Sequence, residues 1–222
     1  MTRVGAVVFD LDGVLIDSES VWDAVRRALT EEWGGQWHGN AHRDMMGMSA
    51  PEWSCYMHER LRVPRSPGEI NVEVVRRMAD AYATHLPLLP GAVDCVRRLA
   101  LHWPLAVASS SNQELIDVVL REAGLQQCFR IVLSSEEVKS GKPAPDVYLE
   151  AANRLGVRPM ACVAIEDSAN GIRSAIAAGM RVVAVPNRQY PPGHEALDLA
   201  QAVVPSLREI TPELVTRVGS AQ

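Results

Sequence analysis

Lysine is almost absent from this sequence of 222 residues. Two of its 22 basic residues are lysines, Lys139 and Lys142, and the remainder are arginines. No block of consecutive basic residues occurs, and the formal net charge is −5. Proteins that bind nucleic acid or an anionic membrane surface usually carry such a block. We therefore expect neither partner, whereas a small anion can still bind at a locally positive site on an acidic protein.

Long apolar runs and paired cysteines are also missing. No stretch reaches the ~18 consecutive apolar residues that a transmembrane helix needs, so we expect none. The apolar run before Asp10 is too short for a signal peptide and lacks a small-residue cleavage site. The cysteines are Cys55, Cys95, Cys128 and Cys162, which are far apart and form no CxxC pair. This spacing favours reduced thiols over a zinc site. We expect a cytoplasmic protein that is a monomer or a weak homodimer.

Strands and helices alternate through most of the chain. A valine-rich run at 4–9 predicts a strand that is buried on both faces, as in a parallel sheet. Further strands are expected at 105–108, 130–133, 162–165 and 181–185, with helices at 92–102, 112–123, 144–155 and 168–178. A weaker tail predicts one more helix and a last strand at 202–204. This alternation indicates βαβ units and a Rossmann-like parallel-sheet core.

One long segment between the first and second strands has helical patterns only. Helices are expected at about 18–33, 51–61 and 69–85, separated by glycines and prolines. The sequence therefore predicts an α/β fold with an inserted all-helical domain. We place the core at residues 1–16 and 87–222 and the insertion at 17–86.

Acids, hydroxyls and a lysine follow the ends of the predicted strands. They are Asp10 and Asp12 after the first strand, Ser109 to Ser111 after the second, Lys142 after the third, and Glu166 and Asp167 after the fourth. The carboxyl ends of parallel strands share one edge of the sheet, where ligands bind. Clustered carboxylates need a cation, and all-oxygen ligands suit Mg²⁺ rather than zinc. The lysine and hydroxyls suit a phosphate group, and an aspartate can attack phosphorus.

Each of these features also has a purely structural explanation. Aspartates often end strands, and the serines precede a predicted helix that one of them can cap. The acids at 166 and 167 suit the N-terminus of the next helix. The combination of all four features is what favours a catalytic site. No GxSxG, Walker A or GxGxxG pattern offers a competing one.

The segment Val-Val-Phe-Asp10-Leu-Asp12-Gly-Val-Leu-Ile-Asp-Ser-Glu resembles the first motif of the haloacid dehalogenase superfamily. Ser109 is similar to its second motif, Gly-Lys142-Pro-Ala-Pro-Asp to its third, and Ile-Glu166-Asp-Ser to its fourth. The four occur in the family's order and span nearly the whole core. The resemblance is to the β-phosphoglucomutase and phosphoglycolate-phosphatase-like branch, whose helical insertion is a cap over the active site.

The resemblance implies roles for the four acids. Asp10 would be the nucleophile, forming an aspartyl-phosphate, and a Mg²⁺ ligand. Asp12 would be the general acid and base, giving its backbone carbonyl to the metal. Asp167 would bind Mg²⁺, and Glu166 would either bind it or support it through water. Ser109 and Lys142 would hold the phosphoryl group with the backbone N–H groups of Leu11 and Ser110.

Departures from the family's patterns separate its activities. A dehalogenase lacks an acid at the position of Asp12, and a phosphonate hydrolase needs a cap lysine, which residues 17–86 do not contain. The β-phosphoglucomutases have a histidine at the position of Trp22, and an arginine where Ala50 follows Gly-Met-Ser. We therefore predict a Mg²⁺-dependent phosphatase acting on a small phosphorylated metabolite such as a sugar phosphate. A sugar phosphomutase is the alternative, and a non-catalytic phosphate-binding regulator is a weaker one.

The cap is expected to select the substrate, closing over the site and excluding water. Four large cap residues are candidates for its inner surface: Trp22, Met46, Met48 and Trp53. They are apolar, which suits a small sugar or polyol phosphate, or a nucleotide base.

Overall fold

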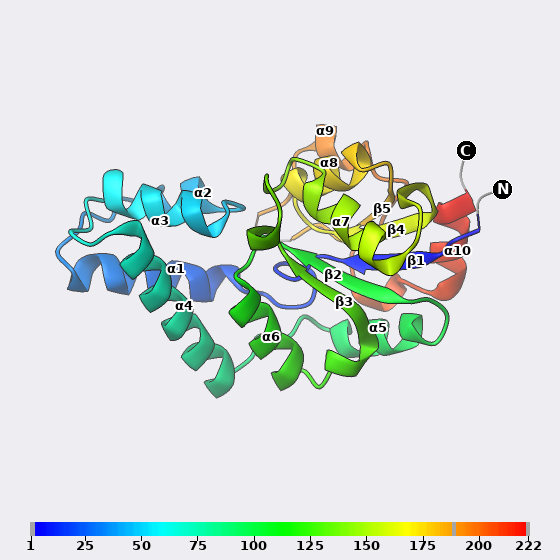
Figure 1. The fold of residues 1–222 in the computed structure, drawn as a ribbon, viewed down its shortest axis with the longest axis horizontal. Coiled ribbons are helices and arrows are strands. Elements are labelled where there is room, and N and C mark those ends of the chain that lie inside the picture. The colour runs from blue at the N-terminus through cyan, green and yellow to red at the C-terminus, as the bar shows by residue number, and fades with distance from the viewer. Residues whose placement is uncertain (1–2, 188–189, 221–222) are drawn as a thin grey trace.

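A parallel six-stranded sheet forms the centre of the core (Figure 1). The computed structural model describes residues 3–187 and 190–220. The strands are β1 (Ala6–Phe9), β2 (Leu105–Ser109), β3 (Phe129–Ser134), β4 (Cys162–Glu166), β5 (Arg181–Ala184) and β6 (Ala202–Val203). Their spatial order is β3-β2-β1-β4-β5-β6, and every neighbouring pair is parallel. The strand that carries Asp10 at its end therefore lies between the strands that lead to Ser109 and Glu166.

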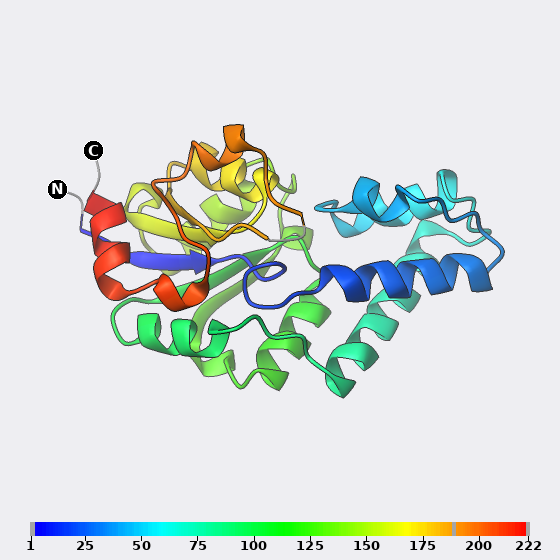
Figure 2. The same cartoon turned by 180° about the vertical axis from the view of Figure 1, so that it is seen from behind.

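Helices cover both faces of this sheet (Figures 1 and 2). Along β1, Val7 and Phe9 join one apolar cluster and Ala6 and Val8 join the other, as the two-residue period of a strand requires. The first cluster includes α5 (Ala92–Ala100), α6 (Gln113–Glu122) and α10 (Pro212–Ser220); the second includes α7 (Asp146–Leu155), α8 (Ala169–Ala177) and α9 (His194–Leu197). The predicted α/β fold with a parallel-sheet core is confirmed.

The segment between β1 and α5 is helical, and it lies at the end of the molecule opposite the chain termini (Figure 2). Its helices are α1 (Glu19–Glu32), α2 (Ala41–Met45), α3 (Ala50–Glu59) and α4 (Pro67–Thr84). Ser49 with Glu52, and Ser66 with Glu69, form capping boxes that start α3 and α4. The sequence predicted three of these helices and not α2, which is only five residues long.

The two connections between the helical segment and the sheet pair with each other. The backbone N–H of Asp17 donates to the carbonyl of Pro87, and that of Leu89 donates to the carbonyl of Leu15. In addition, α4 packs against α6 of the core, and one apolar cluster runs from the sheet into the helical segment. The division of the chain after residues 16 and 86 therefore stays a prediction.

The tail completes the sheet with β6 and covers part of one of its faces with α10. The predicted helix and strand are α9 and β6, while α10 was not predicted. Gly219 of α10 faces the side chain of Val4 so closely that a Cβ there would lie 2.1 Å from it. Short 3₁₀ turns occur at Gln126–Cys128, Ser135–Glu137, Pro159–Ala161 and Leu207–Glu209. Within residues 3–187 and 190–220, the helices are all too short or too polar to cross a membrane.

Two leucines near the end of α5 test how strongly the core depends on burial. Leu99 is fully buried, whereas Leu101 is 84% exposed. We expect Leu99→Ala to lower the free energy of unfolding by about 2–5 kcal/mol, because it leaves a cavity in the packed interior. Leu101→Ala should change it by less than about 0.5 kcal/mol. Urea unfolding measures both, and equal losses would contradict the packing described.

Candidate active site

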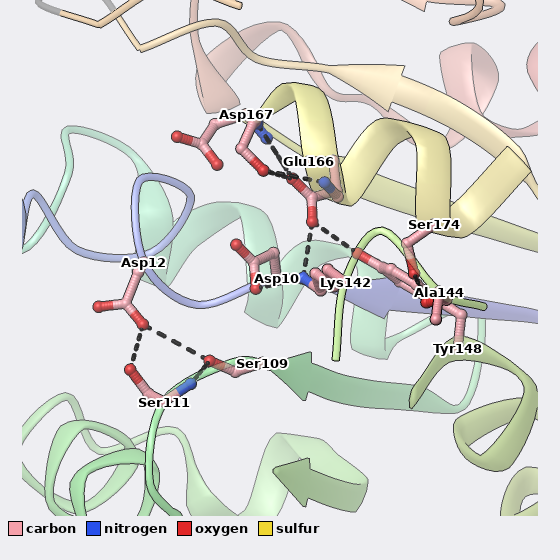
Figure 3. Close-up of polar contacts among 12 residues, drawn as sticks. Asp10, Asp12, Ser109, Ser111, Lys142, Ala144, Tyr148, Glu166, Asp167 and Ser174 are labelled. Carbon is pink, nitrogen blue, oxygen red and sulfur yellow. Dashed lines mark hydrogen bonds and ion pairs between the residues drawn. The ribbon is translucent and has the colours of Figure 1, made fainter. Parts of the chain in front are cut away.

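Lys142 lies between two carboxylates at the carboxyl edge of the sheet (Figure 3). Its Nζ is 2.8 Å from Oδ1 of Asp10, which follows β1, and 2.7 Å from Oε1 of Glu166, which ends β4. All three side chains are nearly or completely buried. One of only two lysines in the chain thus neutralises part of a buried acidic cluster, in which an unpaired charge would be costly.

Among the described residues, this cluster holds more acidic side chains than basic ones. Burial raises the pKa of Asp10 to about 7; the charge of Lys142 opposes this rise and that of Glu166 adds to it. Burial, followed by the charges of Glu166 and Asp10, raises the pKa of Asp167 well above its usual value. Burial alone would lower the pKa of Lys142, but the two carboxylates outweigh it and raise it. The arrangement therefore favours a further cation beside Asp10 and Asp167.

Three acidic side chains are placed to share such a cation. One carboxylate oxygen each from Asp10, Glu166 and Asp167 lies within 4.8 Å of the others. An all-oxygen donor set of this charge fits a hard divalent cation. The carboxylate of Asp12 is not in this group, and its predicted metal contact is through the backbone carbonyl.

Glu166 is held by donors on both of its oxygens. Oε1 accepts hydrogen bonds from Lys142 and from the hydroxyl of Tyr148, 2.9 Å away. Oε2 accepts from the backbone N–H groups of Asp167 and Ser168 and from the Ser168 hydroxyl. This carboxylate is therefore fixed in the protein by five hydrogen bonds.

Two glycines let the acidic side chains approach the backbone. A Cβ at Gly171 would lie 1.6 Å from Oε1 of Glu166, and one at Gly13 would lie 2.0 Å from Oδ2 of Asp167. Gly13 also has a φ of +78°, which side chains disfavour. The turn after β1 and the start of α8 thus require glycine for close approach.

Asp12 points away from the acidic cluster and is held by hydroxyl groups (Figure 3). Its Oδ1 accepts from the hydroxyl of Ser18 at 2.6 Å and lies 3.4 Å from the indole Nε1 of Trp22. Its Oδ2 accepts from the hydroxyl of Ser111 at 2.6 Å, with Ser109 at 3.5 Å. Asp12 is therefore contacted from the core and from α1.

Of the predicted phosphate-binding residues, some line the cavity and others have buried side chains. Ser109 is completely buried at the end of β2, and its Oγ accepts a hydrogen bond from the backbone of Ser111. Ser110 and Lys142 line the cavity above the acidic cluster. Leu11 lies between the two aspartates, with its side chain buried.

A cavity of about 350 Å³ lies between the helical segment and the sheet edge. Asp10, Asp12, Lys142 and Asp167 line it from the core side. The structure places all four predicted cap residues on the opposite wall: Trp22, Met46, Met48 and Trp53. Their roles in binding stay predictions.

Several residues of this site were not found from the sequence. Ser18 was not assigned to the site, and Ser111 was named only among the serines after the second strand, yet both hold Asp12. Tyr148 and Arg26 were not singled out, although Tyr148 contacts Glu166 and Arg26 lines the cavity. The position of Ser111 after the second strand was an available signal, whereas the other contacts depend on tertiary packing.

The haloacid dehalogenase-like hydrolase family model matches residues 4–179, and the chain belongs to this family. It is 35% identical to hexitol phosphatase B of Escherichia coli over 217 residues, which cover 94% of this chain and 95% of that protein. It is 34% identical to a bifunctional riboflavin kinase/FMN phosphatase of Arabidopsis thaliana over 206 residues. That match covers 92% of this chain and 54% of the plant protein, so the chain spans about half of that relative.

Solved structures agree with this assignment. The structure of CbbY from Rhodobacter sphaeroides in complex with phosphate superposes with a TM-score of 0.83 at 25% identity, covering 93% of this chain and 96% of that one. The family resemblance and the prediction of a phosphoric monoester hydrolase are confirmed by these relatives.

The close approach at Gly171 can be tested by adding one methyl group. We expect Gly171→Ala to lower the free energy of unfolding by about 1–3 kcal/mol, because the Cβ displaces the buried Glu166 carboxylate. Gly68→Ala is the matched control, since nothing lies within 4 Å of a Cβ there. Chemical denaturation of both variants is the measurement. If Gly171→Ala left the free energy of unfolding unchanged, the close packing of Gly171 against Glu166 would be wrong.

Proposed function

We propose that the protein is a Mg²⁺-dependent phosphatase that hydrolyses a small phosphate monoester, a sugar phosphate or a similar compound, through an aspartyl-phosphate. The main support is that Lys142 bridges Asp10 and Glu166. A second aspartate, Asp12, lies nearby and is held by a hydroxyl group. The relatives support this substrate class, because the name of hexitol phosphatase B indicates a phosphorylated polyol as its substrate.

Asp10 is the nucleophile in this proposal. Its ionised carboxylate attacks phosphorus, forming an O–P bond as the bond to the leaving oxygen breaks. Burial raises the pKa of Asp10 to about 7 even with Lys142 beside it, so a bound cation would help to keep this carboxylate ionised. Lys142, with its Nζ 2.8 Å from Asp10, opposes the rise and would also neutralise the incoming phosphate.

Asp12 moves the protons. Protonated Asp12 gives its proton to the leaving oxygen in the first step and, as a carboxylate, takes one from the attacking water in the second. The water then forms the new P–O bond and releases Asp10 and inorganic phosphate. The hydroxyls of Ser18 and Ser111 keep both oxygens of Asp12 oriented for these transfers.

Asp10 and Asp167 would hold the Mg²⁺ ion, together with the backbone carbonyl of Asp12. When bound, the ion neutralises the crowded carboxylates and the phosphate oxygens. Glu166 already accepts five hydrogen bonds from Lys142, Tyr148 and the Asp167–Ser168 segment. Its role in this scheme is therefore to support the site by orienting Lys142 rather than to donate a free oxygen.

The volume of the cavity and the residues on its cap side support a small substrate. A volume of about 350 Å³ suits a small phosphorylated metabolite, and Trp22, Met46, Met48 and Trp53 would contact the part of it beyond the phosphate. The phosphomutase alternative is not favoured, because Trp22 directs its indole N–H to Asp12 and offers no second proton-transfer group. The cytoplasmic location and the monomeric or weakly dimeric state stay predictions.

Replacing the nucleophile tests the proposed chemistry. Asp10→Asn keeps the size of the side chain but removes the attacking carboxylate, so we expect kcat to fall by roughly 10⁴-fold or more. Phosphate release measures turnover, and circular dichroism checks the fold. Asp17→Asn is the control, because Asp17 is an exposed acid near the same turn. Retained turnover in Asp10→Asn would overturn the assignment.

Metal dependence and substrate class can be measured together. With Mg²⁺ present, we expect phosphate release from some members of a panel of sugar phosphates, polyol phosphates, phosphoglycolate and nucleotides. Excess chelator should abolish it and added Mg²⁺ should restore it, because the clustered carboxylates need the cation. Full activity in the chelator would exclude the metal site. Conversion of β-glucose 1-phosphate to glucose 6-phosphate without phosphate release would favour the mutase.

A further inference from the structure

Arg26 is a buried cation on the cavity wall that faces the acidic cluster. It belongs to α1, is only 4% exposed, and lines the cavity together with Asp10 and Lys142. Within the described part of the chain its guanidinium has neither an ion pair nor a hydrogen bond, and its Nε is buried without a partner. Burying an arginine in this way is costly unless something supplies a counter-charge.

Two tryptophans fix the position of this guanidinium. Its Cζ lies 4.2 Å from the ring centroid of Trp22 and 4.9 Å from that of Trp53. The two rings are 5.9 Å apart and tilted by 56°, so they form an aromatic corner. Such cation–π contacts stabilise and orient the guanidinium, but they leave its in-plane N–H donors unused. A preorganised arginine with unused donors is suited to bind an oxyanion.

The acids nearest in charge to Arg26 are already engaged. Burial lowers the pKa of Arg26 to about 10, while the charges of Glu19 and Asp12 oppose this, so the side chain remains a cation near neutral pH. Glu19 lies 3.2 Å from the ring of His42. Asp12 accepts hydrogen bonds from Ser18 and Ser111. Neither acid supplies a direct partner.

We propose that Arg26 binds a second anionic group of the substrate, so that the preferred ester carries another phosphate or a carboxylate besides the phosphate that is transferred. This inference rests on the proposed phosphatase function and assigns to Arg26 a role in specificity. Lys142 would face the transferred phosphate from the core, and Arg26 the second anion from the cap. The two cations would thus offset, from the core and from the cap, the repulsion between the acidic cluster and an anionic substrate.

A homologous series of esters tests the proposal directly. The probes are alkyl monophosphates of two to six carbons whose far end carries a hydroxyl, a carboxylate or a second phosphate. The series scans the reach across the cavity, and its two charged end groups distinguish the two kinds of second anion. We expect the wild-type kcat/KM to be higher for one charged series than for the hydroxyl series of equal length.

Variants of two adjacent arginines provide the matched comparison. Arg26→Gln should reduce the preference for the charged end group on the order of tenfold, mainly through KM, because it removes one charge-assisted contact. Arg26→Lys keeps the charge and should retain part of the preference. Arg27→Gln removes the same charge from an exposed position on the same helix and should leave the preference unchanged. Circular dichroism checks that every variant is folded.

Calorimetry separates failure of this inference from failure of the proposed function. The charged probes are titrated into Asp10→Asn and into the double variant with Arg26→Gln. Hydrolysis of all series without preference, or an equal loss for all series in Arg26→Gln, overturns the role of Arg26 and leaves the phosphatase in place. Absence of hydrolysis, with charged probes bound only when Arg26 is present, overturns the phosphatase and supports the role of Arg26.

Discussion

The contact of Lys142 with two buried carboxylates is the interaction on which the rest of the site depends. Without it, the three acids Asp10, Glu166 and Asp167 would share a buried space in which none of the other described residues pairs a cation with them. Lys142 reaches this position from the loop between β3 and α7, while the acids come from β1 and β4. The charge balance of the site therefore couples three connections of the sheet, and it still leaves room for a divalent cation.

Close backbone packing holds these charged side chains together. The strand order puts β1 between β2 and β4, so residues far apart in sequence meet at one sheet edge. Gly13 and Gly171 have no room for a side chain because carboxylates occupy that space. Tyr148, from the first turn of α7, closes the remaining side of Glu166. A buried carboxylate with five donors is rigid, and it transmits that rigidity to Lys142.

Much of the core could be predicted from the sequence because its strands are short, buried apolar runs that lead directly to polar residues. Asp10 and Glu166 were identifiable for this reason. α2 was missed because a five-residue helix carries little periodic signal. α10 was missed although Pro212 at its start and the spacing of Leu214, Val215 and Val218 indicate a helix. The hydroxyl contact of Ser111 and the aromatic corner at Arg26 are tertiary contacts, which periodicity does not encode.

In the proposed mechanism, helix α1 would link substrate recognition to proton transfer. Trp22 contacts Asp12 through its indole N–H and Arg26 through its ring face. Ser18, at the start of the same helix, donates the shorter hydrogen bond to Asp12. Any displacement of α1 relative to the sheet would therefore change both the setting of Asp12 and the position of Arg26. Among the described residues, the core contributes Ser111 and Ser109 to the contacts of Asp12, so the orientation of this carboxyl depends on where α1 lies. In the proposed mechanism, movement of the helical segment and acid–base chemistry would therefore be coupled through these contacts.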